Sequence, residues 1–523
     1  MSDAAPRDEG IAPDPPETEV PWRRLHRDGL KVTALFMLGA SIVAGVPSVT
    51  GIASGTSWPI ALAFAVPGAA VLIAVPTVID AVRLKFTRYR LADARVEMLT
   101  GVLFKRRRSL ARERIRSVDL SANPLQRLFG LVKVKVGTGE SGSGSGATGE
   151  QTLILDSVDR AEAERLRTEL LRRAAVEEGA DGEQRLATWQ PGWLRYAPLS
   201  FLTPLLAGGV VGVTFQVSDW FGRGGLPVKI ATELAERYGP WPTLLLGLAA
   251  VLLLGVIGSF AFQAEAWWGH RLDREPGGTL RVRRGLLVNR SLSLEEERIR
   301  GVEVVEPLGV RSAKAARLDV IAIGLHTGEN NSDLTTLVPA APRPAVSAAA
   351  AAVIGPGEAE LVAHPKAART RRLRWAAVAV LVLAAAVAAV HLLWAIPGFW
   401  SAVMVLAAAL AAAWTVGTAL DAYASLGHGL DRGYLVARRG SVRRSTVHLD
   451  RSGIIGWRIK QSVFQRRMGL MTLDATTAAG RGHYAAVDAD PHEILDFAEE
   501  AVPELLRPFL VREEAESGRS GDR

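Results

Sequence analysis

VTALFMLGASIVAGVPSVTGI, residues 32–52, is an uncharged apolar run that is long enough to cross a bilayer as a helix, for which about 20 residues are needed. Six such runs occur in the 523 residues: Val32–Ile52, Trp58–Ile79, Ala197–Val217, Pro240–Gln263, Trp375–Pro397 and Gly398–Leu420. A soluble protein of this size would not bury six charge-free runs of this length as helices of its core. The sequence therefore predicts an α-helical membrane protein with six spans.

The connections between the runs predict three antiparallel helix hairpins. Spans 1 and 2, and spans 5 and 6, are separated by a few residues, and Ser218–Gly239 separates spans 3 and 4. Basic residues gather on the other side, where the long segments lie: Arg23, Arg24, Arg27, Lys31, Arg83, Lys85, Arg88, Arg90, Arg369, Arg371, Arg372 and Arg374. Because cytoplasmic loops carry an excess of Lys and Arg, we expect a multi-pass protein of the cell membrane with cytoplasmic N- and C-termini.

A related stretch follows each hairpin and indicates an internal repeat. Each copy has a glycine between two strand-like runs, and thirteen residues later an Arg-Ile pair or, in the third copy, Gly-Ile. The glycines are Gly101, Gly285 and Gly440, the arginines are Arg114 and Arg298, and the isoleucines are Ile115, Ile299 and Ile454. Phosphate contacts are one interpretation of the Arg-Ile pairs. We favour a structural one, in which the Ile is buried and the Arg is solvated or paired.

Within each copy, short alternating runs predict strands, the glycine predicts a hairpin turn, and a helix closes the copy. The predicted strands include Arg95–Leu99, Val132–Val136 and Leu318–Ile323, and the predicted helices are Ser157–Ala175, Ala340–Ile354 and Pro491–Leu506. The run Gly139–Gly149 is interpreted as a flexible hairpin tip. Antiparallel strands closed by one C-terminal helix are the plan of a pleckstrin-homology (PH) domain.

Two spans are followed, in this order, by the motifs YRL, RRRSL, RIRSVD and PLQRLFG. The last of these, Pro124–Gly130, is matched by VFQRRMG at Val463–Gly469. This order resembles that of the bacterial PH-like membrane proteins of the YdbS/YdbT type. The resemblance implies three α+β PH-like domains that alternate with three transmembrane helix hairpins. It also implies a binding role, with cell-envelope maintenance as one expectation. Gly453 in place of the arginine and the degenerate second copy depart from the family's pattern.

These features divide the chain into ten predicted segments. They are a disordered tail (1–29), hairpin 1 (30–80), PH-like domain 1 (81–178), a linker (179–195), hairpin 2 (196–264), PH-like domain 2 (265–357), a linker (358–373), hairpin 3 (374–420), PH-like domain 3 (421–508) and a disordered tail (509–523).

No catalytic, metal or cofactor site is predicted. The chain has no cysteine, and HEILDFAEE from His492 lacks the second histidine of a zinc-protease helix. GESGSGSG lacks the lysine of a phosphate loop. His270 and His428, just beyond spans 4 and 6, are interpreted as structural contacts. We expect a protein that is not an enzyme.

The cluster Lys105, Arg106, Arg107 and Arg108 lies in a predicted strand, beyond the positions that membrane topology explains. Such clusters attract anionic headgroups near the cytoplasmic leaflet. We predict lipid contact here, with a solvated basic face or a protein partner as alternatives. In a strand, only Lys105 with Arg107, or Arg106 with Arg108, can share one face.

The expected function is a membrane-anchored scaffold that binds anionic lipids, a protein partner or another copy of itself, and no nucleic acid. A transporter or a transporter accessory subunit is the alternative. It is less favoured because His391 is the one titratable residue within the six predicted spans, whereas transport of polar solutes usually needs ionisable groups in the membrane interior.

Overall fold

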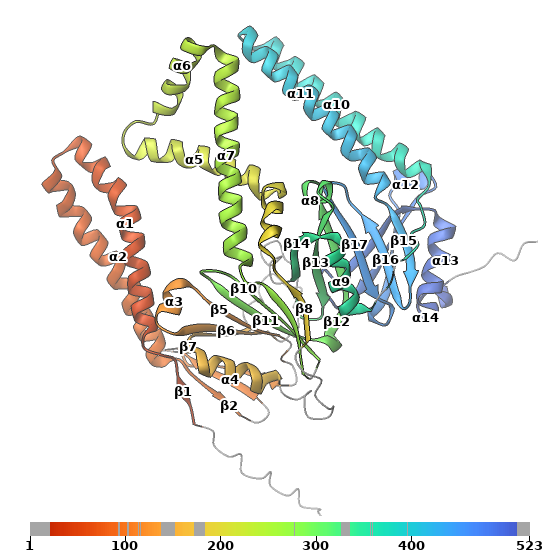
Figure 1. The fold of residues 1–523 in the computed structure, drawn as a ribbon, viewed down its shortest axis with the longest axis horizontal. Helices are drawn as coiled ribbons and strands as arrows, with labels where there is room; N and C mark the ends of the chain where they lie inside the picture. Colours follow the sequence, from red (N-terminus) through yellow and green to blue (C-terminus); the bar gives the residue numbers. More distant parts are fainter. Residues whose placement is uncertain are drawn as a thin grey trace, which may run out of the picture.

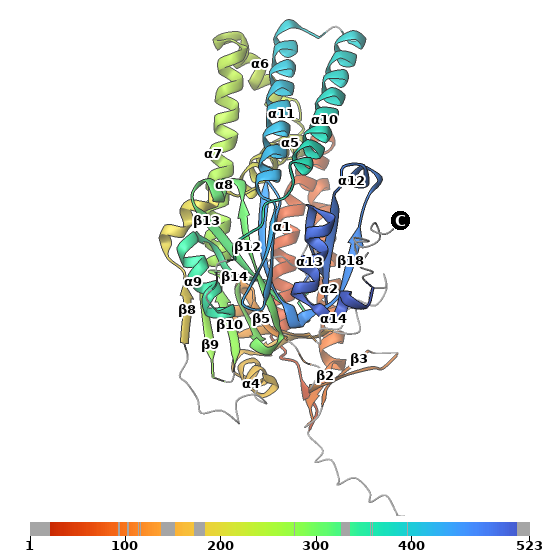
Figure 2. The ribbon, with the colours of Figure 1, turned by 90° about the vertical axis from the view of Figure 1, so that its right-hand side faces the viewer.

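The computed structural model describes residues 21–92, 95–101, 104–112, 115, 117–137, 152–171, 184–276, 278–325, 335–355, 357, 359–394 and 396–509. Within these ranges, long apolar helices extend to one side of a group of β-sheets (Figures 1 and 2). The chain therefore separates its apolar helices from its charged sheets, as the alternation of apolar and charged segments predicts.

Among the described residues, five helices are long and apolar enough to cross a membrane. They are α1 (Gly29–Gly55), α2 (Trp58–Phe86), α7 (Pro240–Trp267), α10 (Lys366–Leu393) and α11 (Gly398–Ala424). α1 packs along α2, and α10 packs along α11 (Figure 1). Most of their large apolar side chains are exposed, as expected for surfaces that face lipid.

The third predicted span, Ala197–Val217, is not one straight helix. A 3-10 helix, η3 (Pro191–Leu199), is followed by α5 (Leu202–Trp220) at an angle of 66°, and the two together count as a sixth candidate span. Tyr196 belongs to the apolar core of unit 2, and its neighbour Ala197 is also buried. Pro198 and Pro204 flank the bend, and proline interrupts the backbone hydrogen bonds of a helix. An additional helix, α6 (Leu226–Tyr238), leads to α7.

The strands of the described part of the chain form four antiparallel sheets. The first has the order β1 (Arg23–Arg24), β2 (Arg88–Leu91), β3 (Arg95–Thr100), β4 (Arg106–Ala111). The second has the order β7 (Thr152–Asp159), β6 (Leu131–Gly137), β5 (Ser117–Ala122), β11 (Asn289–Glu295), β10 (Thr279–Arg284), β9 (Arg271–Glu275), β8 (Gln184–Thr188). The third has the order β14 (Thr336–Pro342), β13 (Ala315–Ala322), β12 (Ile299–Pro307), β17 (Arg443–Asp450), β16 (Tyr434–Arg439), β15 (Gly427–Asp431). The fourth has the order β18 (Ile454–Lys460), β19 (Met471–Thr477), β20 (His483–Ala489).

Three repeated units account for most of these strands. Unit 1 is β2–β7 with helix α4 (Arg160–Leu171), unit 2 is β9–β14 with α9 (Arg343–Ile354), and unit 3 is β15–β20 with α13 (Pro491–Ala501) and α14 (Pro503–Leu506). Each has its own apolar core, to which its helix contributes. The closing helices lie within the predicted ranges, but the first two begin three residues later than predicted, because Ser157–Asp159 belongs to β7 and Ala340–Pro342 to β14. The third is divided before Pro503, and residues 172–175 and 139–149 lie outside the described residues.

Neighbouring units share sheets, which the sequence analysis did not predict. β5 of unit 1 pairs with β11 of unit 2, and β12 of unit 2 pairs with β17 of unit 3, both antiparallel. Two β-sheets are thus continuous across the unit boundaries. The three units therefore form one connected body.

A strand from before each of the first two hairpins also joins the unit that follows it. β1 pairs with β2, and β8 pairs with β9. Before the third hairpin, Val362 forms an isolated bridge with His428. Residues that the sequence assigned to the N-terminal tail and the first linker are thus part of the sheets, and one residue of the second linker bridges to β15. Their pairing partners lie beyond a pair of long apolar helices, so local sequence could not reveal the pairing.

Candidate functional site

The repeat glycines have a structural role in the turn between the second and third strands of each unit. Gly101, Gly285 and Gly440 have φ angles of 111°, 110° and 102°. A Cβ atom at each would lie 2.0, 1.9 or 2.1 Å from the carbonyl oxygen three residues later. Only glycine accepts both this conformation and this close approach.

The Arg-Ile pairs also lie in structural positions where they are described. Ile115 and Ile454 are buried, and Ile299 packs on the core of unit 2. Arg298 forms an ion pair with Glu295, whereas Arg114 lies outside the described residues. At Gly453, a Cβ atom would lie 2.6 Å from Cδ of Arg300, so the side chain of unit 2 occupies the space that a residue larger than glycine would need.

The PLQRLFG and VFQRRMG motifs form two short helices, α3 (Pro124–Leu128) and α12 (Val463–Arg467). Each begins with a capping box, made by Asn123 with Gln126 and by Ser462 with Gln465. The related segment of unit 2 forms α8 (Leu308–Ser312). α3 contacts α1, and Phe464 of α12 packs edge-on against Trp375 of α10 at 5.9 Å between ring centroids. These helices therefore lie where the apolar helices meet the sheets.

The cluster Lys105–Arg108 lies at the start of β4, with Lys105 just before the strand. Arg107 donates a hydrogen bond to Glu97 at 2.6 Å. Burial alone would raise the pKa of Glu97, but the hydrogen bonds from Arg90 and Arg107 lower it. Arg106 and Arg108 lie on the other face, opposite Thr100 and Met98. Lipid contact by this cluster stays a prediction.

His270 and His428 are both buried just beyond α7 and α11. The Nε2 atom of His270 lies 2.7 Å from the carbonyl oxygen of Leu337. Burial lowers the pKa of His270 to about 4, and it also lowers the pKa of His428 to about 4. His428 Nδ1 lies 3.0 Å from Nε2 of His364. The contacts are those of neutral, packed imidazoles that fix the beginning of a unit.

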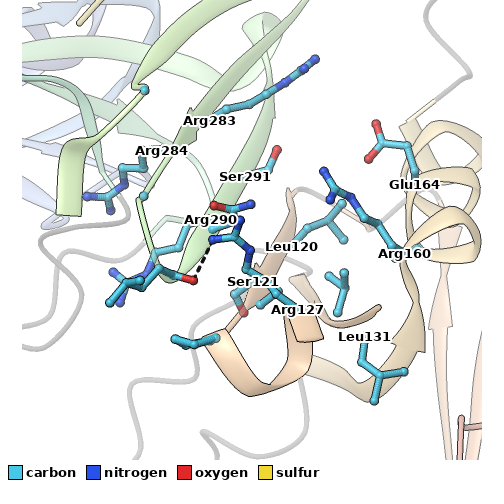
Figure 3. A pocket seen from close by; sticks show the side chains of 18 of the residues that line it. Leu120, Ser121, Arg127, Leu131, Arg160, Glu164, Arg283, Arg284, Arg290 and Ser291 are labelled. Carbon is cyan, nitrogen blue, oxygen red and sulfur yellow. Dashed lines mark hydrogen bonds between the residues drawn. The ribbon is translucent and has the colours of Figure 1, made fainter. Parts of the chain in front are cut away.

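A pocket of about 700 Å³ lies at the junction of units 1 and 2. Its walls come from β5 and α3 of unit 1, the start of α4, and the β10–β11 hairpin of unit 2 (Figure 3). Trp268, which follows the last residue of α7, completes the lining. The pocket is therefore next to the end of a candidate membrane-spanning helix.

The charge of the pocket is strongly positive. Six arginines line it among the described residues: Arg127, Arg160, Arg281, Arg283, Arg284 and Arg290. Glu164 is the one carboxylate of the described lining. An arginine guanidinium presents several N–H donors in a fixed plane, which suits the oxygens of phosphate groups. The donor set therefore favours a phosphate-bearing ligand over a cation.

The arginines are held in place from several elements. Arg127 donates hydrogen bonds to the carbonyl oxygens of Leu286 and Leu287, at 2.5 and 3.1 Å, so it ties α3 to the hairpin tip (Figure 3). The Arg284 guanidinium lies over the ring of Trp267, 4.0 Å from its centroid. Glu265 at the end of α7 accepts hydrogen bonds from the backbone of the same hairpin tip. The β10–β11 hairpin, α3 and the end of α7 are thus connected.

An ion-pair network includes two residues of the pocket lining, Glu164 and Arg281. Arg167 of α4 and Arg281 of β10 contact Glu275 of β9, with N–O distances of 2.8 and 3.0 Å. Both arginines also contact Glu164 at 3.0 Å. Burial alone would raise the pKa of Glu275, but these two arginines lower it. Burial and the charge of Arg167 lower the pKa of Arg281.

Sequence reasoning missed this pocket. Arg281, Arg283 and Arg284 lie in the second repeat, LRVRRGLLVNR, for which the sequence analysis predicted a turn at Gly285 but no ligand site. Arg127 and Arg160 come from a different unit. Because the pocket depends on the pairing of β5 with β11, it could have been found only by predicting that sheets are shared.

No group of three or more potential metal ligands was found in the described part of the chain. His391, in the fifth predicted span, has its Nε2 atom 2.7 Å from the hydroxyl of Ser401. His492 lies on α13, where the Asp490 side chain accepts hydrogen bonds from the first backbone N–H groups.

The Bacterial PH domain family matches residues 39–174 and 373–502, just over half of the chain. The first match covers most of hairpin 1 and unit 1, and the second covers most of hairpin 3 and unit 3. No curated protein and no solved structure matches the chain. With strands and closing helices arranged as described, the chain belongs to the Bacterial PH domain family.

Proposed function

We propose that this protein is a non-enzymatic membrane scaffold in which three PH-like domains alternate with three helix hairpins, with the domains and both termini on the cytoplasmic side. The pocket between units 1 and 2 binds a phosphate group, and its source is the headgroup of an anionic lipid. The arrangement of six arginines around one pocket, beside the end of α7, carries this proposal.

Position and chemistry both support a lipid over a soluble phosphate. Trp268 lies in the pocket lining and directly follows α7, and tryptophan is enriched at the membrane–water interface. Basic residues close to a cytoplasmic leaflet attract anionic lipids by about 1 kcal/mol each. A lipid headgroup in this pocket would contact unit 1 and unit 2 together, so lipid binding would stabilise the junction between them.

The test uses the full chain in nanodiscs or detergent. Native mass spectrometry measures retention of phosphatidylglycerol, of phosphatidylcholine, and of inorganic phosphate. We expect selective retention of phosphatidylglycerol, and Arg127→Gln and Arg160→Gln should each weaken it about tenfold, as expected for loss of one charge-assisted hydrogen bond. Arg165→Gln is the matched control, because Arg165 is an exposed residue of α4 that does not line the pocket.

Binding of inorganic phosphate without selective lipid retention, sensitive to the same two substitutions, would assign the pocket to a soluble phosphate. Equal retention of both lipids, or equal effects of Arg160→Gln and Arg165→Gln, would contradict phosphate binding in the pocket.

A further inference from the structure

The two junctions between units use the same strand register. At the first, Leu294 faces Ser117 and Leu292 faces Asp119. At the second, Leu449 faces Gly301 and Val447 faces Glu303. In both, the ninth residue after the repeat glycine faces the second residue after the repeat isoleucine. The third strand of a unit is thus covered, in a fixed register, by a strand of the preceding unit.

The third strand of unit 1, β4, is the edge of its sheet among the described residues. By the repeat numbering, Leu110 and Arg108 correspond to Leu294 and Leu292 of unit 2. A strand edge presents unpaired N–H and C=O groups that can pair with another chain. The strand edge that the preceding unit covers in units 2 and 3 is therefore uncovered at β4 among the described residues.

The charges on β4 indicate what can cover it. Arg106 is exposed and Arg108 is half-buried, and neither forms an ion pair within the described part of the chain. They lie on one face of the strand, with Arg107 bonded to Glu97 on the other. Both internal covering strands place a carboxylate, Asp119 or Glu303, opposite the residue that corresponds to Arg108.

The exposed edge strand of a second copy of this protein does not fit the β4 edge. β18 of unit 3 corresponds to β5 and β12, and it is an edge strand among the described residues. In the shared register, Arg458 would face Arg108 and Lys460 would face Arg106. Like charges directly opposite each other destabilise a pair of strands, whereas opposite charges stabilise it. A second copy bound head to tail is therefore disfavoured.

We propose that the β4 edge binds an extended acidic segment of a partner protein, which adds to the sheet as an antiparallel strand with carboxylates opposite Arg108 and Arg106. The main-chain hydrogen bonds supply affinity and the alternating side chains supply specificity, as in other cases of strand addition. This surface is separate from the arginine pocket, and its occupancy does not depend on lipid binding there.

The test measures fluorescence anisotropy of labelled peptides with the full chain in detergent. The acidic probe is Ser-Val-Asp-Leu-Glu-Ala, the β5 sequence with glutamate in place of Ser121, and the control probe has lysine at both acidic positions. We expect the acidic peptide to bind at least ten times more tightly than the lysine peptide. N-methylation of the amides that face β4 should abolish binding.

The charge-reversed variant Arg106→Glu/Arg108→Glu should lose the acidic peptide and gain the lysine peptide, which also shows that the variant is folded. Arg165→Glu, on the exposed side of α4, should bind as the unaltered chain does. Equal binding of the two peptides, or no saturable binding of the acidic peptide at millimolar concentration, overturns the proposal.

Two other occupants would give different results. If anionic vesicles bind through Arg106 and Arg108 while the acidic peptide does not, the edge contacts lipid and the proposal is wrong. If the chain forms assemblies that grow with concentration, and the charge-reversed variant does not, the occupant is a second copy and the proposal is again wrong.

Discussion

Glu275→Gln should destabilise the joint body formed by units 1 and 2. Glu275 contacts Arg167 and Arg281, and each arginine side chain is 8% exposed. Removing one partner of a buried ion pair costs roughly 3–5 kcal/mol, because the other charge stays buried without its counter-charge. Glu275 itself is 18% exposed and Glu164 still contacts both arginines, so we expect about 3 kcal/mol.

The measurement is thermal unfolding of the purified full chain in detergent, followed by intrinsic fluorescence. For folded regions of this size, about 3 kcal/mol corresponds to a decrease of roughly 6–12 °C in the midpoint. Glu297→Gln is the control, because Glu297 is exposed and its substitution should change stability by less than about 0.5 kcal/mol.

A double-mutant cycle separates the ion pair from other effects. Arg167→Met should cost less in the Glu275→Gln background than in the unaltered chain, since the two residues interact directly. The reasoning fails if the unfolding midpoint of Glu275→Gln lies within a degree or so of that of Glu297→Gln. It also fails if the effects of Glu275→Gln and Arg167→Met on stability are additive, because the network would then not hold the junction together.

Acid should weaken unit 2 through His270, whose pKa in the folded chain is about 4, below its ordinary value of 6.5. Since the unfolded chain binds this proton first, the stabilisation is complete above about pH 6.5 and is lost as the pH falls toward 4, by about 1.4 kcal/mol per pH unit. The difference between the unfolding midpoints at pH 7.5 and pH 5 should therefore be smaller in His270→Gln than in the unaltered chain. An unchanged difference would exclude His270 as the cause. The topology is tested by single cysteines, because the chain contains none of its own. Cysteines at Ser57 and Gly398 should react with a membrane-impermeant maleimide in intact cells, and one at Ala478 should react only after lysis; early labelling of Ala478 would refute cytoplasmic domains.

The sequence alone was sufficient for the local features of this protein. Five of the six predicted spans correspond to helices that are long and apolar enough to cross a membrane, because such a helix satisfies all its backbone hydrogen bonds within one apolar segment. The turn glycines were also predictable, since Gly101, Gly285 and Gly440 recur between strand-like runs and only glycine fits their φ angles. The capping residues of α3 and α12 also act within a few positions of one another, although the sequence analysis predicted no helix at these two motifs.

Features that join distant segments were decided only by the tertiary structure. Ala197 is apolar enough for a span, yet it is buried and its neighbour Tyr196 packs in the core of unit 2. Apolarity alone does not distinguish a protein core from lipid. β8 pairs with β9 across the helices α5 to α7, and β5 pairs with β11 across a unit boundary. The edge of a strand carries the same backbone groups whichever strand covers it, so sequence leaves the choice of partner open. That choice brings Arg127 of unit 1 beside Arg284 of unit 2, and so creates the pocket.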